Sequence, residues 1–369
     1  MTIGIIVEPY EEENTSGISY AIMSQAKTLL QIDKGNDYIL YTHKPITSQR
    51  FEGRYRNVLV PKSFLGKNAW FLFACLFKRR DIPRVLLFNM PLLPMVLPWS
   101  VRTIPIFYEL SAYQKTGKIS PSQSLRRRLY AFFEKEAVRR ASYIVTASSG
   151  PRADIMSYFS LSPEKVLVIP LGFQKFEAST DGGTRFKDQR NHFLFVGRVK
   201  HKKNVHTIVD GFIAFRQQNP SAKNMLFVVG LNGGRYYESI VDKVRQAGLA
   251  HEVVFTGFVS DADMYYLYKN AQALVFCSLQ EGFGMPILEA MDFGIPVITS
   301  NRAPMNEVGG DAALIVDPEN VLDITKAMET LAFKDSLRND YIRKGREHVK
   351  LFSWDTHARK LLEKVQSSL

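Results

Sequence analysis

Short apolar runs alternate with amphipathic segments along the whole chain. The runs have the length of strands buried on both faces, and the segments between them carry apolar residues at helical spacing. Alternation of strand and helix predicts an α/β fold with doubly wound parallel sheets, whose ligands bind at the carboxyl ends of the strands. The predicted strands are residues 4–7, 38–42, 84–88, 103–107, 142–147 and 166–170, then 192–196, 225–230, 253–256, 273–278, 296–299 and 313–316.

One polar, glycine-containing stretch divides this pattern. Residues 176–190 have the composition of a linker. We therefore expect an N-terminal α/β domain over 1–175 and a C-terminal α/β domain over 191–352, each with its own sheet. A last helical segment begins after Phe352-Ser353-Trp354.

The composition is that of a globular protein from a reducing compartment. Of 369 residues, 46% are hydrophobic, which is ample for two separate cores. Cys75 and Cys277 lie in apolar runs and indicate no disulfide framework. The N-terminus reads as a strand rather than a signal peptide, and no apolar run reaches the roughly 20 residues that cross a bilayer. We expect a cytoplasmic location, compatible with peripheral binding to the inner face of the cytoplasmic membrane.

The net charge of +12 is concentrated in the first half. Residues 1–170 hold 23 Lys and Arg against 13 Asp and Glu, a net of +10, and the remaining 25 and 23 give +2. Such a basic half can face nucleic acid, an anionic membrane or an acidic substrate. The chain has no paired Cys/His zinc ligands and no RNA-binding aromatic signature, so nucleic acid is not an expected partner. An anionic membrane surface or a phosphate-bearing lipid is expected instead.

Two basic clusters are candidates for contact with that surface. Residues 68–80 (N-A-W-F-L-F-A-C-L-F-K-R-R) are apolar nearly all round and end in Lys78, Arg79 and Arg80. The segment suits a lipid headgroup layer, but it also suits a buried helix with a solvated basic end, and both interpretations stay open. The second cluster lies away from the apolar stripe of a predicted helix over 124–141. It consists of Arg126, Arg127 and Arg128.

The stretch 277–300 has the pattern of an anion-binding turn. A buried strand leads into a loop with Gly282 and Gly284, where backbone can approach a ligand closely. Pro286 suits the first turn of a helix, which Gly294 then ends. A helix N-terminus behind a glycine-rich loop offers free N–H groups and a positive dipole end, which suits phosphate.

Two carboxylates, Glu281 and Glu289, bracket this turn. Each can accept hydrogen bonds from two neighbouring hydroxyls, which suits the diols of a sugar or a ribose. Their context, E-G-F-G-M-P-I-L-E, closely resembles the signature of the retaining, nucleotide-sugar-dependent glycosyltransferases of family 4. That family has the GT-B fold, with two Rossmann-like domains, a cleft between them and a C-terminal helix (here 353–369) that packs back on the first domain. The resemblance implies that Glu281 lies against the donor sugar and that Glu289 binds the ribose hydroxyls. The donor-binding residues between them are Gly282, Phe283, Gly284, Met285 and Pro286.

The same resemblance assigns a diphosphate site. Family members hold the donor diphosphate with an Arg and a Lys five residues apart, a spacing that Arg198 and Lys203 match. Gly17, in the loop after the first strand, is a candidate backbone donor to the diphosphate, and Val259 is a candidate contact to the base. Because two cations already compensate the phosphates, neither a metal nor a cofactor is expected.

Two further acidic positions need separate interpretation. Asp261 and Asp263 match a metal-binding pattern of another glycosyltransferase architecture, but they follow Ser260 and read better as the acidic first turn of a capped helix. At Tyr108 and Glu109 the chain departs from the family, whose members often carry a His-Asp pair there. Glu109 remains a second catalytic candidate, as a contact to a sugar hydroxyl or to the acceptor.

These residues together predict a retaining, metal-independent hexosyltransferase. The resemblance implies a nucleotide-diphosphate sugar as donor, with GDP-mannose favoured because this form of the motif is frequent among mannosyltransferases. The basic first half favours a lipid-linked glycan acceptor, as in bacterial surface polysaccharide biosynthesis. Two alternatives stay open: a non-catalytic GT-B protein that binds nucleotide or glycan, and a nucleotide-sugar epimerase of the same fold. A nicotinamide dehydrogenase is poorly supported, because the Rossmann glycine fingerprint is absent.

Overall fold

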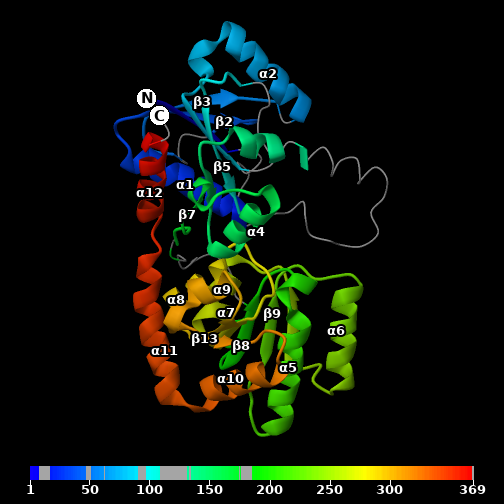
Figure 1. Ribbon diagram of the computed structural model, residues 1–369. Helices are drawn as coiled ribbons and strands as arrows, with labels where there is room; N and C mark the ends of the chain where they lie inside the picture. Colours follow the sequence, from blue (N-terminus) through cyan, green and yellow to red (C-terminus); the bar gives the residue numbers. More distant parts are fainter. Residues whose placement is uncertain are drawn as a thin grey trace. The chain divides into compact units, whose positions relative to one another are not determined.

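The computed structural model describes residues 1–7, 17–46, 51–61, 63–89, 97–108, 131–132, 134–173, 175 and 185–367 (Figure 1). The chain divides into two compact units. The first combines Met1–Gly172 with Ser353–Leu369, and the second is Phe173–Phe352.

Seven parallel strands form the sheet of the first unit, in the order β3-β2-β1-β4-β5-β6-β7. The strand order reverses between β1 and β4, as in a doubly wound sheet. The strands are β1 Thr2–Ile6, β2 Asp37–Thr42, β3 Tyr55–Leu59, β4 Val85–Asn89, β5 Arg102–Phe107, β6 Ile144–Thr146 and β7 Val166–Val168. The helices are α1 Gly17–Ile32, α2 Phe64–Phe77, α4 Ser149–Phe159 and α12 Trp354–Ser367, with short turns η1 Arg79–Asp81 and η3 Pro163–Lys165.

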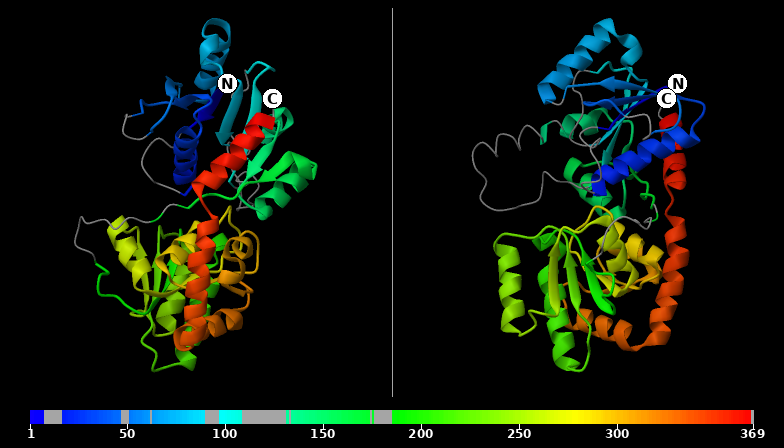
Figure 2. Two further views of the ribbon diagram at one scale, coloured as in Figure 1. Left: turned by 90° about the vertical axis from the view of Figure 1, so that its left-hand side faces the viewer. Right: turned by 180° about the vertical axis from the view of Figure 1, so that it is seen from behind.

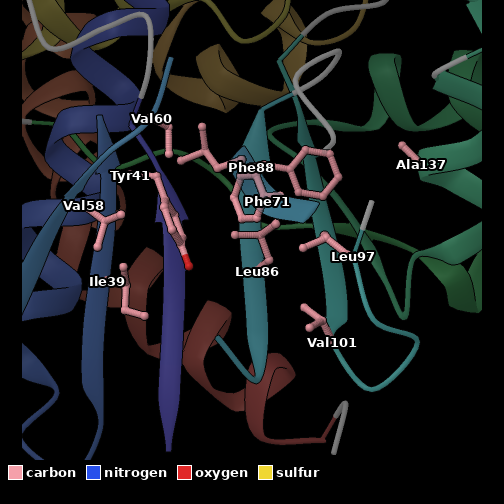
Figure 3. Close-up of a cluster of buried hydrophobic side chains, with 11 residues drawn as sticks. Ile39, Tyr41, Val58, Val60, Phe71, Leu86, Phe88, Leu97, Val101 and Ala137 are labelled. Atoms are coloured by element: carbon pink, nitrogen blue, oxygen red, sulfur yellow. The ribbon is translucent and has the colours of Figure 1, made fainter. Parts of the chain in front are cut away.

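Helix α2 covers one face of this sheet. Tyr41 of β2 and Leu86 and Phe88 of β4 point to that face, because side chains alternate along a strand, and Phe71 of α2 packs among them (Figure 3). The ring of Tyr41 lies 5.2 Å from that of Phe71, and its hydroxyl donates to the carbonyl of Asp81 at 2.6 Å. The inward side of α2 is therefore fixed by aromatic packing.

Six parallel strands form the sheet of the second unit, in the order β10-β9-β8-β11-β12-β13. The strands are β8 His192–Val196, β9 Leu226–Val229, β10 Val253–Gly257, β11 Ala271–Phe276, β12 Val297–Ser300 and β13 Leu314–Val316. The helices are α5 Val205–Gln218, α6 Arg235–Gln246, α7 Asp261–Lys269, α8 Met285–Phe293, α9 Met305–Gly309, α10 Val321–Phe333 and α11 Asp335–His348, with η4 His201–Lys203, η5 Gly310–Ala312 and η6 Val349–Leu351. The predicted α/β class with two doubly wound parallel sheets is confirmed. Within the residues described, no helix combines the length and the apolar character needed to cross a bilayer.

The sequence pattern missed one strand and shifted others by one or two residues. No strand was predicted at residues 55–59, which form β3, where only Val58 is buried because β3 lies at the edge of the sheet. The strand predicted at 273–278 is β11, which starts to pair with β8 at Ala271. Cys277 and Ser278 are buried but lie beyond the strand. The predicted strand included them because they continue the apolar run of the sequence.

The predicted linker 176–190 also differs in part from the structure. Residues 176–184 lie outside the described part of the chain. Phe186 is buried, with its ring 5.5 Å from that of Phe227, so the end of this stretch packs on the second unit. Because the stretch is polar in composition, the sequence pattern did not reveal that Phe186 anchors its end.

Buried contacts hold α12 to the first unit, where it packs against α1 (Figure 2). His357 hydrogen-bonds through Nδ1 with the carbonyl of Pro170 at 2.9 Å and through Nε2 with Oε1 of Gln25 at 3.0 Å. A Cβ added at Gly172 would lie 2.3 Å from the backbone nitrogen of Trp354. Close backbone approach at Gly172 therefore seats the first turn of α12.

Replacing Gly172 by alanine should destabilise the first unit by about 1–3 kcal/mol, the usual cost of overpacking. The added methyl group would overlap backbone, which cannot move aside as a flexible side chain can. The measurement is the urea midpoint of unfolding for Gly172→Ala. Gly35→Ala is the matched control, since the nearest atom to its added Cβ is 3.7 Å away, and it should stay within about 0.5 kcal/mol of the wild type. Equal effects of the two variants would contradict the close approach.

Candidate functional site

The candidate site lies where the strand order of the second sheet reverses. The strands β8 and β11 are neighbours there, and the loops after them, 197–204 and 277–284, leave the carboxyl ends of the two strands. In open α/β sheets a ligand binds in the crevice outside such a reversal point. Six of the predicted site residues lie in these two loops: Arg198, Lys203, Glu281, Gly282, Phe283 and Gly284.

Tight backbone contacts shape the loop after β8. The N–H of Gly197 donates to the carbonyl of Val229 at 2.8 Å. Gly230 has φ +131°, and a Cβ there would lie 2.4 Å from the carbonyl oxygen of Gly197, so the close approach of the two turns requires glycine. The loop then passes through η4 and ends at Asn204, which adopts a left-handed conformation just before α5.

Buried Asn204 ties this loop to its neighbours. Its amide nitrogen donates to the carbonyl of Cys277 at 3.0 Å and to that of Pro318 at 2.6 Å, and its Oδ1 accepts from the Thr207 hydroxyl at 2.7 Å. The loop after β11 is also bonded directly, because the N–H of Leu279 donates to the carbonyl of Lys202 at 2.9 Å. The relative position of the two loops is therefore set by buried hydrogen bonds.

An ion pair between Lys203 and Glu281 also joins the two loops. Lys203 Nζ donates to Glu281 Oε1 at 2.5 Å, and the side chains are only 18% and 9% exposed. The same ammonium lies 5.4 Å from the centre of the Phe276 ring. Two residues that were predicted for different parts of one ligand, the diphosphate and the sugar, are thus in direct contact.

Arg198 has a different environment in the same loop. Its side chain is exposed, and within the described ranges no carboxylate forms an ion pair with its guanidinium. Among the predicted diphosphate-binding cations, Lys203 is therefore compensated by Glu281, whereas no described carboxylate compensates Arg198. Such an arrangement leaves net positive charge for an anionic group.

Helix α8 starts at the end of the second loop. Gly284 precedes it with φ +109°, a conformation that a residue with a side chain rarely adopts, and Pro286 occupies its first turn. Phe283 is buried, with its ring 6.0 Å from that of Phe352, whereas Met285 and Pro286 are half-buried. Phe283 therefore anchors the loop, and Gly284 lets the chain turn into the helix.

Glu289 lies in the second turn of α8. Its Oε2 accepts from the hydroxyl of buried Tyr268 at 2.5 Å. Burial raises the pKa of Glu289 to about 7, and the hydrogen bond from Tyr268 acts in the opposite direction. At neutral pH the site thus holds a carboxyl group close to its own titration point.

The remaining predicted residues are spread over the chain. Gly17 is the first residue of α1 in the first unit, and Val259, which is 5% exposed, follows β10. Glu109 lies outside the described residues, and so do Arg126, Arg127 and Arg128. No finding tests the roles assigned to these residues, which stay predictions.

The acidic pair, Asp261 and Asp263, lies in the first turn of α7. Ser260 caps α7 by accepting from the N–H of Asp263 at 3.1 Å, as predicted. The Oδ1 of Asp263 accepts from the N–H of Arg185 at 2.9 Å, so this carboxylate is already engaged. Within the part of the chain that the structure describes, no three His, Cys, Asp or Glu residues gather in a way that could hold a metal ion.

The pattern of the sequence missed three residues at this site. Asn204 and Tyr268 gave no signal of their own, because their partners are distant in sequence. Ser278, two residues after the end of β11, is fully buried, and its hydroxyl oxygen has no hydrogen-bond partner among the described residues. A buried polar atom without a partner is uncommon, and it is consistent with a hydrogen-bonding position for a bound ligand.

The sequence comparisons point to one family. Residues 179–348 match the family model for glycosyl transferases group 1. The chain is 27% identical over 275 residues to O-antigen chain mannosyltransferase B of Escherichia coli, a match that covers 69% of this chain and 67% of that protein. It is 30% identical over 200 residues to O-antigen chain mannosyltransferase RfbU of Salmonella typhimurium, which covers 54% of each protein. The matches thus span between about half and two thirds of the length of these relatives.

Solved structures resemble the whole chain. Sucrose-phosphate synthase from Thermosynechococcus elongatus superimposes with a TM-score of 0.70 at 17% identity, covering 100% of this chain and 98% of that one. Anabaena HepE in complex with UDP and glucose gives a TM-score of 0.71 at 15% identity and covers 100% of both chains. At such identities the likeness establishes the fold, which is GT-B.

The buried ion pair should contribute measurably to the stability of the second unit. We expect a double-mutant cycle of Lys203→Met and Glu281→Gln to give a coupling energy of about 1–3 kcal/mol in urea unfolding, because removing one partner leaves the other charge poorly solvated. The matched control is the pair Lys350–Glu347, whose side chains are 66% and 67% exposed. Its coupling should stay below about 0.5 kcal/mol. Equal coupling in the two pairs would contradict the burial of the first.

The raised pKa of Glu289 makes stability depend on pH. A carboxyl group with a folded pKa near 7 and an unfolded pKa of 4.5 binds its proton more tightly in the folded state, so the free energy of unfolding falls as pH rises from 4.5 to 7. Glu289→Gln keeps an acceptor for Tyr268 without the charge and should be more stable than the wild type by about 1–3 kcal/mol at pH 8, with a smaller difference at pH 5. Thermal unfolding at both pH values measures this, with exposed Glu363→Gln as control. If the stability advantage of Glu289→Gln did not change with pH, ionisation of Glu289 would not destabilise the folded state.

Proposed function

This chain belongs to the glycosyl transferases group 1 family through its residues 179–348, and from this premise we propose that it is a retaining glycosyltransferase that transfers mannose from GDP-mannose to a lipid-linked glycan. The named activity of two relatives, O-antigen chain mannosyl transfer, supports mannose as the sugar and bacterial surface polysaccharide as the product. The observation that carries the proposal is the Lys203–Glu281 pair at the reversal point of the second sheet.

The cations of the site would stabilise the departing diphosphate. Arg198 offers a guanidinium that no described carboxylate pairs with, and Lys203, five positions later in the same loop, is held in place by Glu281. The N-terminus of α8 adds free N–H groups and a positive dipole end. Because Lys203 and the start of α8 are positioned before the reaction, they favour the developing negative charge on the leaving group without reorganisation. The same cations take the place of a metal ion, so we propose that the reaction is metal-independent.

The carboxylates would orient the donor. When phosphate oxygens engage Lys203, Glu281 loses part of its ion pair and becomes available to accept hydrogen bonds from sugar hydroxyls. Glu289 would accept from the two ribose hydroxyls, and a diol that donates to this carboxyl group favours its ionised form. Glu289→Gln should therefore weaken nucleotide binding even though it stabilises the fold. Retention would follow if the acceptor hydroxyl attacks on the face from which the diphosphate leaves, and no residue is assigned here as a nucleophile.

The location proposed for this reaction is the cytoplasmic face of the membrane. A lipid-linked acceptor is anchored in a bilayer, so the enzyme must reach it there. The first 170 residues carry a net charge of +10, which favours association with an anionic leaflet. Peripheral binding would bring the donor site and the acceptor to the same surface.

A nucleotide-binding experiment tests the proposal. GDP at about 100 times its dissociation constant should raise the free energy of unfolding by about 2.7 kcal/mol, and UDP, ADP and CDP at the same concentration should raise it less. The shift should persist in EDTA. Arg198→Gln should weaken GDP binding at least about tenfold, because a charge-assisted contact is lost.

Arg245→Gln is the matched control for that experiment. It makes the same change of charge at an exposed arginine near the end of α6, where Asp242 is its partner. Its GDP affinity should equal that of the wild type. No response to any nucleotide would contradict the donor site. Stabilisation by UDP alone would leave the proposal of a glycosyltransferase in place but with a UDP-sugar as donor. Nucleotide binding without mannose transfer to the lipid-linked acceptor would favour a binding protein.

A further inference from the structure

Helix α2 is apolar on two opposite faces. The inward face packs on the sheet through Phe71 (Figure 3), and Ala74, one turn further along α2, is also fully buried. The opposite face points away from the sheet, since its residues lie about half a helical turn from these positions. That face, the outer ridge of α2, comprises Leu72, Phe73, Leu76 and Phe77, whose exposed fractions are 48%, 46%, 63% and 73%.

Cations follow the outer ridge directly. Lys78, Arg79 and Arg80 are all exposed, and Lys78 Nζ lies 5.9 Å from the centre of the Phe73 ring. The sequence of α2, F-L-G-K-N-A-W-F-L-F-A-C-L-F, contains no acidic residue. Asp81, which follows the cluster, is paired with Arg56 at 3.2 Å. The ridge and the cations thus form one surface that is apolar at its centre and positive at its end.

We propose that the outer ridge of α2, together with Lys78, Arg79 and Arg80, binds the anionic surface of a phospholipid bilayer. Apolar side chains of an interfacial helix enter the boundary between headgroups and acyl chains, and basic residues beside them attract anionic headgroups. The inference rests on the proposed function in one respect, because a lipid-linked acceptor gives the enzyme a reason to bind a bilayer. It names the element that makes the contact.

Charge argues against a second copy of the chain as the occupant of this surface. If two α2 helices packed ridge to ridge, each would bring cations and no acidic side chain of its own. The described carboxylate nearest in sequence to the cluster, Asp81, already has a cationic partner. An anionic bilayer supplies the missing negative charge as well as the apolar phase.

A second observation concerns an exposed aromatic residue beside cations in the same unit. Trp99 is 74% exposed, and the guanidinium groups of Arg139 and Arg140 lie 5.3 and 5.1 Å from the centre of its ring. Ala137, from the same helical segment as these arginines, belongs to the buried cluster that also contains Phe71 (Figure 3). An exposed tryptophan combined with cations is typical of residues that lie at headgroup level.

Sedimentation with lipid vesicles tests this proposal. The wild-type protein at low salt should bind vesicles of phosphatidylcholine with 30% phosphatidylglycerol and should bind pure phosphatidylcholine vesicles at least about tenfold more weakly. Leu76→Ser/Phe77→Ser should lose at least about tenfold in affinity for the anionic vesicles, because most of the exposed apolar surface is removed. Lys78→Gln/Arg79→Gln/Arg80→Gln should lose roughly fivefold for each cation removed, and its remaining binding should respond less to salt.

The matched control removes two exposed leucines from the second unit. Leu322 and Leu337 are 57% and 42% exposed, and Leu322→Ser/Leu337→Ser should bind the vesicles as the wild type does. GDP-induced stabilisation should be equal in all of these variants, which separates loss of the membrane surface from loss of the donor site or of the fold. Undiminished vesicle binding by Leu76→Ser/Phe77→Ser, or no binding by the wild type, would overturn the proposal. A dimer that this variant disrupts, without vesicle binding, would assign the ridge to a second copy of the chain.

Discussion

The ion pair between Lys203 and Glu281 is the interaction on which the site depends. It joins two loops that leave neighbouring strands at the reversal point of the sheet, and it lies at 9–18% exposure, where water cannot fully replace either partner. The pair can persist there because hydrogen bonds between uncharged groups fix the two loops that carry it. Asn204 bonds the first loop to the second, and the carbonyl of Lys202 accepts from Leu279. Backbone and amide hydrogen bonds thus fix the geometry of the two loops. These bonds do not depend on the charges of Lys203 and Glu281.

Several groups at this site are poorly explained by stability alone. Burial raises the pKa of Glu289 to about 7, so its ionisation at neutral pH opposes folding. The hydroxyl of Ser278 is buried without a partner, and Arg198 carries a charge that no described carboxylate balances. Each group would be satisfied by a ligand with phosphate oxygens and hydroxyls. Departures from local stability that share one location indicate a functional site more strongly than any one of them does.

The sequence predicted the elements of this site better than their contacts. The strand 192–196 was predicted with its exact bounds, because F-L-F-V after His192 is continuously apolar and the strand lies at the centre of the sheet. The edge strand β3 was missed, because only Val58 of its five residues is buried. The spacing of Glu281 and Glu289 identified the turn, but the Lys203–Glu281 pair joins residues 78 positions apart. Local periodicity contains no information about such a contact, which arises only when β8 and β11 become neighbours.

Helix α2 shows where periodicity stops being informative. A helix that is apolar on one face reveals which side is buried, but residues 68–77 are apolar nearly all round, so the pattern left both burial and membrane contact open. The structure separates the two faces. Aromatic packing against Tyr41 accounts for Phe71, whereas nothing in the described part of the first unit accounts for the exposure of Phe77. An exposed ridge of four large apolar side chains promotes aggregation unless something covers it. The three cations that follow select for a covering surface that is both apolar and anionic, and a bilayer with anionic headgroups has both properties.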